Sequence, residues 1–168
     1  MTIFAHYFPE MNLKNNTPLA RPLHLITRDY VDAFTHKLTH LDIDRHFYIL
    51  ILIENEGNCI TQQELAQTLQ VDKVTIGRII DYLVKNKYVI RAKHPSDKRA
   101  HHLKLTEKAV KVLPEIKKVV CELNKISVQG LSKEETDCFF KVARQIQLNL
   151  AKLPADTIQY KFNKIRRK

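Results

Sequence analysis

Lys73, Thr75 and Arg78 stand close together in the chain, and their side chains have the chemistry of nucleic-acid contacts. A lysine pairs with phosphate, a threonine hydroxyl both donates and accepts, and an arginine can bind guanine through two parallel hydrogen bonds. Arg99 follows further along, and an arginine suits the negative potential of the minor groove. These residue types predict contacts with a DNA duplex if the fold brings them to one surface.

Two short helical patterns position the first three of these residues. Thr61 and Glu64 form a capping-box pattern for the first helix, and Asp72 is expected to cap the second helix, which starts at Lys73. The basic and hydroxyl-bearing residues of the second helix lie largely off its apolar stripe, as in a recognition helix that enters the major groove. We expect the core to bury that stripe, which consists of Val74, Ile76, Ile79, Ile80, Leu83 and Val84.

The pattern changes from helical to extended after this second helix. Residues 88–90 are β-formers, residues 94–97 have turn chemistry, and residues 102–105 alternate polar with apolar side chains. These segments predict a β-hairpin with Arg99 at its tip, oriented by a charge-assisted hydrogen bond to Asp97. Two helices joined by a tight turn and followed by a basic hairpin indicate a winged helix-turn-helix.

Residues 64–109 resemble the winged helix of the multiple antibiotic resistance regulator (MarR) family. The family pattern is roughly ELA-x-x-L-x-V-x-K-x-T-V-x-R-x-(I/V)-D-x-L, then G-(L/Y)-(I/V)-x-R, P-x-D-x-R and L-T-x-x-G. The chain departs from it at Asn86-Lys87, where the family usually has Lys-Gly, and at Lys108, where it often has Gly. The residues that match in order are Glu64, Leu65, Ala66, Leu69, Lys73, Thr75, Arg78, Asp81, Leu83, Arg91, Asp97 and Arg99.

The residue types and the resemblance together assign expected roles on DNA. Lys73, Thr75 and Arg78 are expected to face the major groove, and Arg99 is expected to enter the minor groove. Arg91 and Lys98 are expected to touch phosphates, and Asp97 is expected to orient Arg99 at the tip of the hairpin. The expected DNA-binding residues are therefore Lys73, Thr75, Arg78, Arg91, Asp97, Lys98 and Arg99.

The overall charge favours an anionic partner. The 168 residues include 28 Lys and Arg against 18 Asp and Glu, which gives a net charge of +10 and a pI near 9.6. Between Asp72 and Lys104 nine basic residues face three acidic ones. A charge run alone is usually a solvated surface, but on a winged-helix pattern it favours association with double-stranded DNA.

Composition and motifs argue against other classes of protein. The chain has three glycines and neither a GxGxxG nor a GKS/T motif, so we expect neither an enzyme nor a cofactor. It shows no signal-peptide pattern and no apolar run long enough to span a membrane, which predicts a cytoplasmic protein. Its cysteines, Cys59, Cys121 and Cys138, are expected to be reduced, buried and inert.

Long amphipathic helices are expected on both sides of the winged helix. The spacing predicts a helix over residues 18–41, a buried helix over 44–56 and a brief strand near 59–60 that could add to the hairpin. A third long helix is expected over 106–129, with Pro114 kinking or restarting it. Its inward stripe is expected to be Val110, Leu113, Ile116, Val119, Val120, Leu123 and Ile126.

A last helix is expected after a capping box formed by Ser132 and Glu135, and it carries its own apolar seam. These flanking helices need burial elsewhere, and a two-fold homodimer supplies it and matches palindromic DNA. The fold class is therefore mainly α (α+β), a winged helix-turn-helix flanked by N- and C-terminal dimerisation helices. The expected parts are 1–44 (arm and dimerisation helix), 45–105 (DNA-binding domain) and 106–168 (dimerisation helices and basic tail). The seam residues are Phe139, Ala143, Ile146, Leu150 and Leu153.

The expected function is a dimeric, sequence-specific transcriptional regulator. The resemblance implies a repressor of a palindromic operator, with a small phenolic or other lipophilic anion as effector. His24, Arg28 and Phe47 are candidates for binding it, because an anionic aromatic ligand favours a cation beside an aromatic wall. Two alternatives stay open: a metal-dependent regulator using the i, i+4 pair His36 and His40, although no metal site is predicted, and an architectural or adaptor protein without a defined operator.

Overall fold

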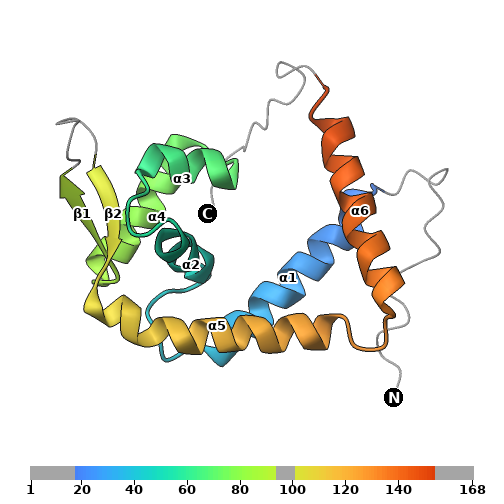
Figure 1. Ribbon diagram of the computed structural model, residues 1–168, viewed down its shortest axis with the longest axis horizontal. Coiled ribbons are helices and arrows are strands. Elements are labelled where there is room, and N and C mark those ends of the chain that lie inside the picture. Colours follow the sequence, from blue (N-terminus) through green and yellow to red (C-terminus); the bar gives the residue numbers. More distant parts are fainter. Residues whose placement is uncertain (1–17, 94–100, 154–168) are drawn as a thin grey trace, which may run out of the picture. The chain divides into compact units, whose positions relative to one another are not determined.

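A computed structural model describes residues 18–93 and 101–153 of the protein (Figure 1). The chain forms two compact units, residues 1–127 and 128–168, each of which is described by itself. The first unit holds five helices and a two-stranded sheet in its described part, and the second holds one helix. The elements are α1 (Ala20–Lys37), α2 (Phe47–Asn55), α3 (Gln62–Leu69), α4 (Lys73–Lys85), β1 (Val89–Lys93), β2 (His101–Leu105), α5 (Glu107–Ser127) and α6 (Lys133–Leu150).

The core of the first unit forms around α2, as its nearly continuous apolar sequence predicts. Leu50 and Ile53 have no exposed surface, and Tyr48 is the large apolar residue of α2 that faces solvent. The helix is shorter than the expected 44–56, and it ends at a turn in which Gly57 and Asn58 both adopt positive φ. The same core takes in Leu65 of α3 and buried residues of α1, α4, α5 and the sheet.

The starts of α3 and α4 lie where the capping patterns predict them. The Thr61 hydroxyl accepts from the Glu64 amide at 3.2 Å, and the Glu64 carboxylate accepts from the Thr61 amide at 2.8 Å. Asp72 Oδ1 accepts from the amides of Val74 and Thr75, both at 2.9 Å. These bonds satisfy amides that would otherwise have no partner at a helix start. Both sequence-based predictions are confirmed.

The hairpin is antiparallel, with Val89 opposite Leu105 and Lys93 opposite His101. Val89 and Leu103 point into the core, so one face of the sheet is anchored. The expected third strand near residues 59–60 is reduced to a single bridge between Thr61 and His102, with the Leu103 amide donating to the Ile60 carbonyl at 2.8 Å. The capping box explains this limit, because the chain turns into α3 directly after Thr61.

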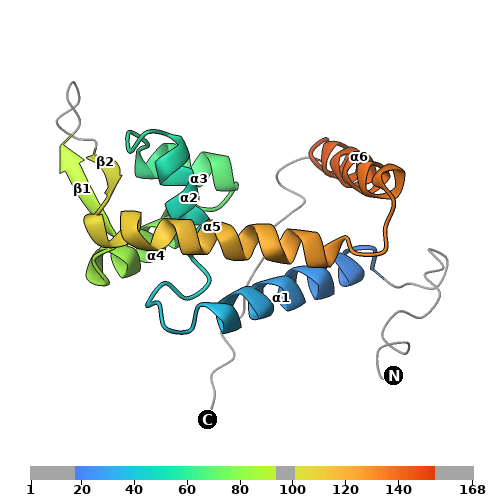
Figure 2. The same ribbon diagram turned by 60° about the horizontal axis from the view of Figure 1, so that its bottom comes forward.

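Helices α1 and α5 lie side by side within the first unit (Figure 2). Lys37 pairs with Glu122 at 2.9 Å, and the Tyr30 hydroxyl donates to Asn124 at 2.9 Å. The expectation that α1 continues to residue 41 is wrong, because the helix ends at Lys37. Its buried end consists of Phe34, followed by Leu38 at the C-cap, whereas its first turns are largely exposed.

Two expectations about α5 also need correction. The structure has one continuous helix with Pro114 inside it, so of the two outcomes expected there the restart is wrong; Figure 2 shows α5 as a single helix. Val110 and Ile126 are 56% and 54% exposed rather than inward. The buried stripe instead contains Ala109, one residue and about 100° around the helix from Val110. This stripe consists of Ala109, Leu113, Ile116, Val119 and Leu123.

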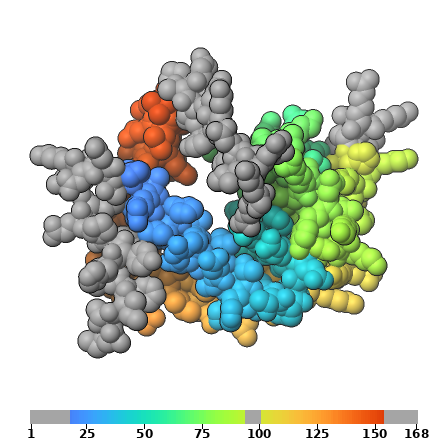
Figure 3. Space-filling view, turned by 180° about the vertical axis from the view of Figure 1, so that it is seen from behind, coloured from blue at the N-terminus to red at the C-terminus, as the bar shows by residue number. Residues whose placement is uncertain are grey.

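The segment between α1 and α2 lies against α4. In Figure 3 the cyan chain that follows α1 borders the green of α4. The Asn86 side-chain amide donates to the Asp42 carbonyl at 3.0 Å, and the His46 ring meets the Tyr82 ring edge-on at 5.4 Å between centroids. Burial lowers the pKa of His46, as does the charge of Arg45, whereas the Asp44 carboxylate acts in the opposite direction.

Helix α6, in the second unit, begins at the predicted capping box. The Ser132 hydroxyl accepts from the Glu135 amide at 3.1 Å, and Glu135 accepts from the Ser132 amide at 2.7 Å. None of its residues is buried. Its large exposed apolar side chains, with the Leu153 that follows the helix, are Phe139, Phe140, Val142, Leu148, Leu150 and Leu153.

Lys87 stands at the corner between α4 and β1, at the position where the MarR family pattern usually has glycine. Lys87 adopts a left-handed conformation, with φ of 60°. The Tyr88 amide donates to the Leu83 carbonyl at 2.9 Å, and the Lys87 amide donates to the Val84 carbonyl at 3.0 Å. This is the Schellman ending that glycine usually completes. Lys108 donates to the Asn86 carbonyl at 3.0 Å and lies over the Tyr88 ring, so it braces the same corner.

We expect Lys87→Gly to stabilise the protein by about 0.5–1 kcal/mol. The left-handed conformation costs a residue with a Cβ roughly 1–2 kcal/mol, and glycine avoids this cost. The extra conformational freedom of glycine in the unfolded chain offsets part of the resulting stabilisation. Urea unfolding of parent and variant measures the difference. Lys85→Gly is the matched control, because Lys85 is helical and the substitution there should destabilise by about 1 kcal/mol. A destabilising Lys87→Gly would contradict this account of the corner.

The lowered pKa of His46 predicts a loss of stability in acid. The unfolded chain takes up a proton on this ring at a higher pH than the folded protein does. The free energy of unfolding should therefore fall as the pH drops from about 7 through the ordinary histidine range near 6.5. Urea unfolding at about pH 7.5 and 5.5 measures this change, which should be smaller in His46→Gln. The same change in both proteins would refute the assignment.

Candidate nucleic-acid interface

Helix α4 has two faces that differ sharply in burial. Ile76, Ile80 and Leu83 have no exposed surface and fix the inner face in the core. Val74 was expected on this stripe but is 63% exposed, and that expectation is wrong. Val74 precedes Ile76 by two residues, which is about 200° around the helix, so both cannot face the core.

The outer face of α4 carries the residues predicted to meet the major groove. Lys73, Thr75 and Arg78 are all exposed. Within residues 18–93 and 101–153, neither Lys73 nor Arg78 has an ion-pair partner. Arg78 lies one helical turn after Val74 on the same face.

Thr75 is held by the cap of its own helix. Its hydroxyl donates to Asp72 Oδ2 at 2.5 Å, and its amide donates to Asp72 Oδ1. These hydrogen bonds, that from the Thr75 hydroxyl first, lower the pKa of Asp72. The hydroxyl proton of Thr75 is therefore already used in a hydrogen bond. What Thr75 can present to a base is its hydroxyl oxygen, as an acceptor, and its methyl group.

Arg91 ties the wing to α4. Its guanidinium donates to Asp81 Oδ1 at 2.7 Å, which joins β1 to the outer face of α4. The expected phosphate contact of Arg91 stays a prediction. The paired guanidinium has further N–H donors, so the ion pair and a phosphate contact are compatible.

The remaining predicted DNA contacts, Asp97, Lys98 and Arg99, lie outside the described residues. Lys93 and His101 form the last pair of the sheet, and residues 94–100 connect them. The roles of the three residues stay predictions from sequence.

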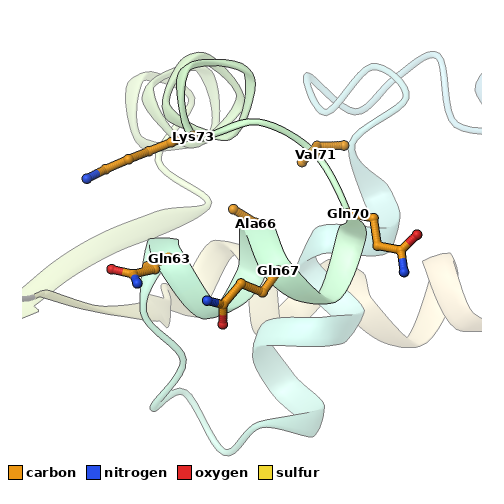
Figure 4. Close-up of a pocket in the computed structure, with 6 residues that line it drawn as sticks. All are labelled: Gln63, Ala66, Gln67, Gln70, Val71 and Lys73. Carbon is orange, nitrogen blue, oxygen red and sulfur yellow. The ribbon is translucent and has the colours of Figure 1, made fainter. Parts of the chain in front are cut away.

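A hollow of about 420 Å³ opens between α3 and the start of α4 (Figure 4). Lys73, already expected to contact DNA, lines it together with three glutamine side chains that the sequence had not indicated as site residues. Gln63 and Gln67 lie one turn apart on α3, and this polar i, i+4 pair was the available signal. The hollow is lined by Gln63, Ala66, Gln67, Gln70, Val71 and Lys73.

The three candidate effector residues occupy different environments. His24 and Arg28 are exposed on α1, and Arg28 pairs with Asp29 at 2.7 Å. Phe47 lies in the core, stacked on Phe34. The aromatic wall expected for a ligand is thus already covered by another ring, and the effector role of these residues stays a prediction.

The pair His36 and His40 does not share a helical face as expected. Because α1 ends at Lys37, His40 lies beyond the helix, where its Nε2 is 3.1 Å from a Glu115 oxygen of α5. The described part of the chain contains no group of three or more side chains placed to hold a metal ion.

The expectation of buried cysteines is wrong, because Cys59, Cys121 and Cys138 are all exposed in this chain. The reason is positional. Cys121 lies two residues from Val119 and Leu123, so it faces away from the buried stripe of α5.

None of the helices within residues 18–93 and 101–153 combines the length and apolar character that a bilayer crossing requires.

Comparison with known proteins finds one family that the winged-helix segment resembles. Residues 42–100 match the sequence model of the MarR family, and this match covers α2, α3, α4 and β1. Over this segment the chain is similar to regulators of the MarR family. The members of this family are transcriptional regulators rather than enzymes, and the winged-helix prediction is confirmed.

Solved structures of the family share the fold. A crystal structure of MarR is 26% identical, with 85% of this chain and 96% of that chain covered and a TM-score of 0.68. The transcriptional regulator SlyA is 25% identical over 80% of this chain and 94% of its own, with a TM-score of 0.72. A MarR family regulator from Listeria monocytogenes, solved in complex with a 26mer DNA, is 24% identical over 80% and 90%, with a TM-score of 0.71.

Proposed function

We propose that this chain is a homodimeric repressor that binds a palindromic operator and is released by a small lipophilic anion. The observation that carries the proposal is the outer face of α4, where Lys73 and Arg78 lack ion-pair partners among the described residues while Ile76 and Ile80 hold the opposite face in the core. A rigid helix with exposed cations on one face can meet the base edges of a duplex.

Charge supports DNA as the partner. The net charge is +10 for each chain, so a dimer carries about +20, and each phosphate contact releases counterions. The Listeria regulator with the same fold was solved on DNA. We infer that α4 enters the major groove, that Arg99 reaches the minor groove, and that Arg91 and Lys98 touch phosphates.

Exposed apolar surface supports the dimer. In the first unit, Leu23 and Ile26 of α1 are exposed, as is Leu19 at its N-cap, and in the second unit α6 buries none of its residues. Such surfaces usually mark interfaces. We infer that a second copy covers them, that residues 45–105 read the DNA, and that residues 1–44 and 106–168 pair the subunits.

The effector-binding region is inferred from the exposed polar groups of α1. His24 and Arg28 place cationic and polar groups on exposed α1, and a lipophilic anion needs such a group beside apolar surface. We propose this end of α1 as its binding region. Release then follows if the anion favours a dimer in which the two α4 helices no longer match successive grooves.

Selection of bound sequences from a random duplex pool tests the proposal. We expect the parent chain to enrich an inverted repeat whose half-sites lie about one helical turn apart. Selection with Arg78→Ala should lose the preference at one base position, where a guanine contact is worth about 1–3 kcal/mol. Arg99→Ala should weaken binding to selected and random duplexes alike.

Lys111→Ala is the matched control for charge, because Lys111 is an exposed cation on α5, outside residues 45–105 that are proposed to read the DNA. It should enrich the same repeat as the parent. Salt-sensitive binding without any enriched repeat would refute the operator and favour an architectural protein. Equal losses on selected and random duplexes for both arginine variants would refute the division of roles.

A further inference from the structure

Val74 is an apolar residue of α4 that does not contribute to the buried core. Among residues 18–93 and 101–127, no large apolar side chain is more exposed than Val74, at 63%. It lies in the first turn of α4, and its amide is fixed on Asp72 at 2.9 Å. The side chain of a β-branched residue in a helix adopts essentially one rotamer. Its two methyl groups are therefore presented in a defined direction.

The neighbours of Val74 indicate what kind of surface it meets. Lys73 and Thr75 flank it, and Arg78 follows one turn later on the same face. An apolar protein partner at this point would bury Lys73 and Arg78, which have no ion-pair partner within residues 18–93 and 101–153, and burying such charges is costly. The major-groove edge of an A·T pair instead offers one apolar group, the C5-methyl of thymine, among acceptors and phosphates that suit lysine and arginine.

We propose that Val74 reads the C5-methyl of a thymine in each half-site. This inference rests on the proposed DNA-binding function and adds a specificity-determining residue to it. A separation of four residues along α4 is a rise of about 6 Å, against about 3.4 Å for each base-pair step. The thymine should therefore lie within two base pairs of the guanine that Arg78 contacts.

Replacing each thymine of the selected repeat singly with deoxyuridine tests the inference, because this removes the C5-methyl and leaves base pairing intact. Fluorescence anisotropy at fixed salt measures each affinity. One position in each half-site should weaken binding by the parent about three- to fivefold, as expected for burial of one methyl group. Val74→Ala should bind the thymine and deoxyuridine duplexes equally, at about the weaker affinity.

Val110→Ala is the matched control, because Val110 is also exposed and lies on α5. It should keep the parent's discrimination between thymine and deoxyuridine. Circular dichroism and urea unfolding check that Val74→Ala remains folded, as expected for an exposed helical position. If Val74→Ala keeps the full discrimination, the methyl is read by another group, such as the Thr75 methyl, and the inference fails.

The test also separates this inference from the function on which it rests. If the parent enriches an inverted repeat but tolerates deoxyuridine at every position, the inference fails and the operator stands. If the parent enriches no repeat, both fail together.

Discussion

The burial of one face of α4 is the constraint on which the rest of the structure depends. Ile76, Ile80 and Leu83 are fully buried, and each contributes roughly 2 kcal/mol of hydrophobic stabilisation. Rotating the helix to bury Val74 would expose several of them, and that cost is comparable with the stability of a small domain. The core therefore decides which side chains face outward, and these are the side chains proposed to read DNA.

Three sets of local interactions fix the two ends of α4 and its connection to β1. Asp72 caps its start and also binds the Thr75 hydroxyl, so the first turn is ordered before any ligand arrives. At its end, Lys87 completes the turn into β1 in a left-handed conformation, and Lys108 braces that turn. Arg91 on β1 pairs with Asp81 on α4. A recognition surface preorganised in this way loses little conformational entropy on binding.

Local signals in the sequence predicted the helix starts and the hairpin well, because caps and turns depend on neighbouring residues. The capping boxes at Thr61 and Ser132 were correct for that reason. Burial was harder, because a valine beside an apolar stripe can fall on either face, and Val74 and Val110 both proved exposed. The contact between His40 and Glu115 joins distant segments, so no local pattern could have shown it. Lys73 and Arg78 are exposed as the sequence predicts, but their contacts depend on DNA and stay a prediction.

A crystal structure of the chain bound to its selected duplex tests the central claim most directly. The account predicts that the first turns of α4 lie in the major groove of each half-site, with Arg78 on a base edge and Ile76 and Ile80 still in the core. An α4 that lies along the phosphates without reaching a base, or a duplex held by another surface, would contradict it.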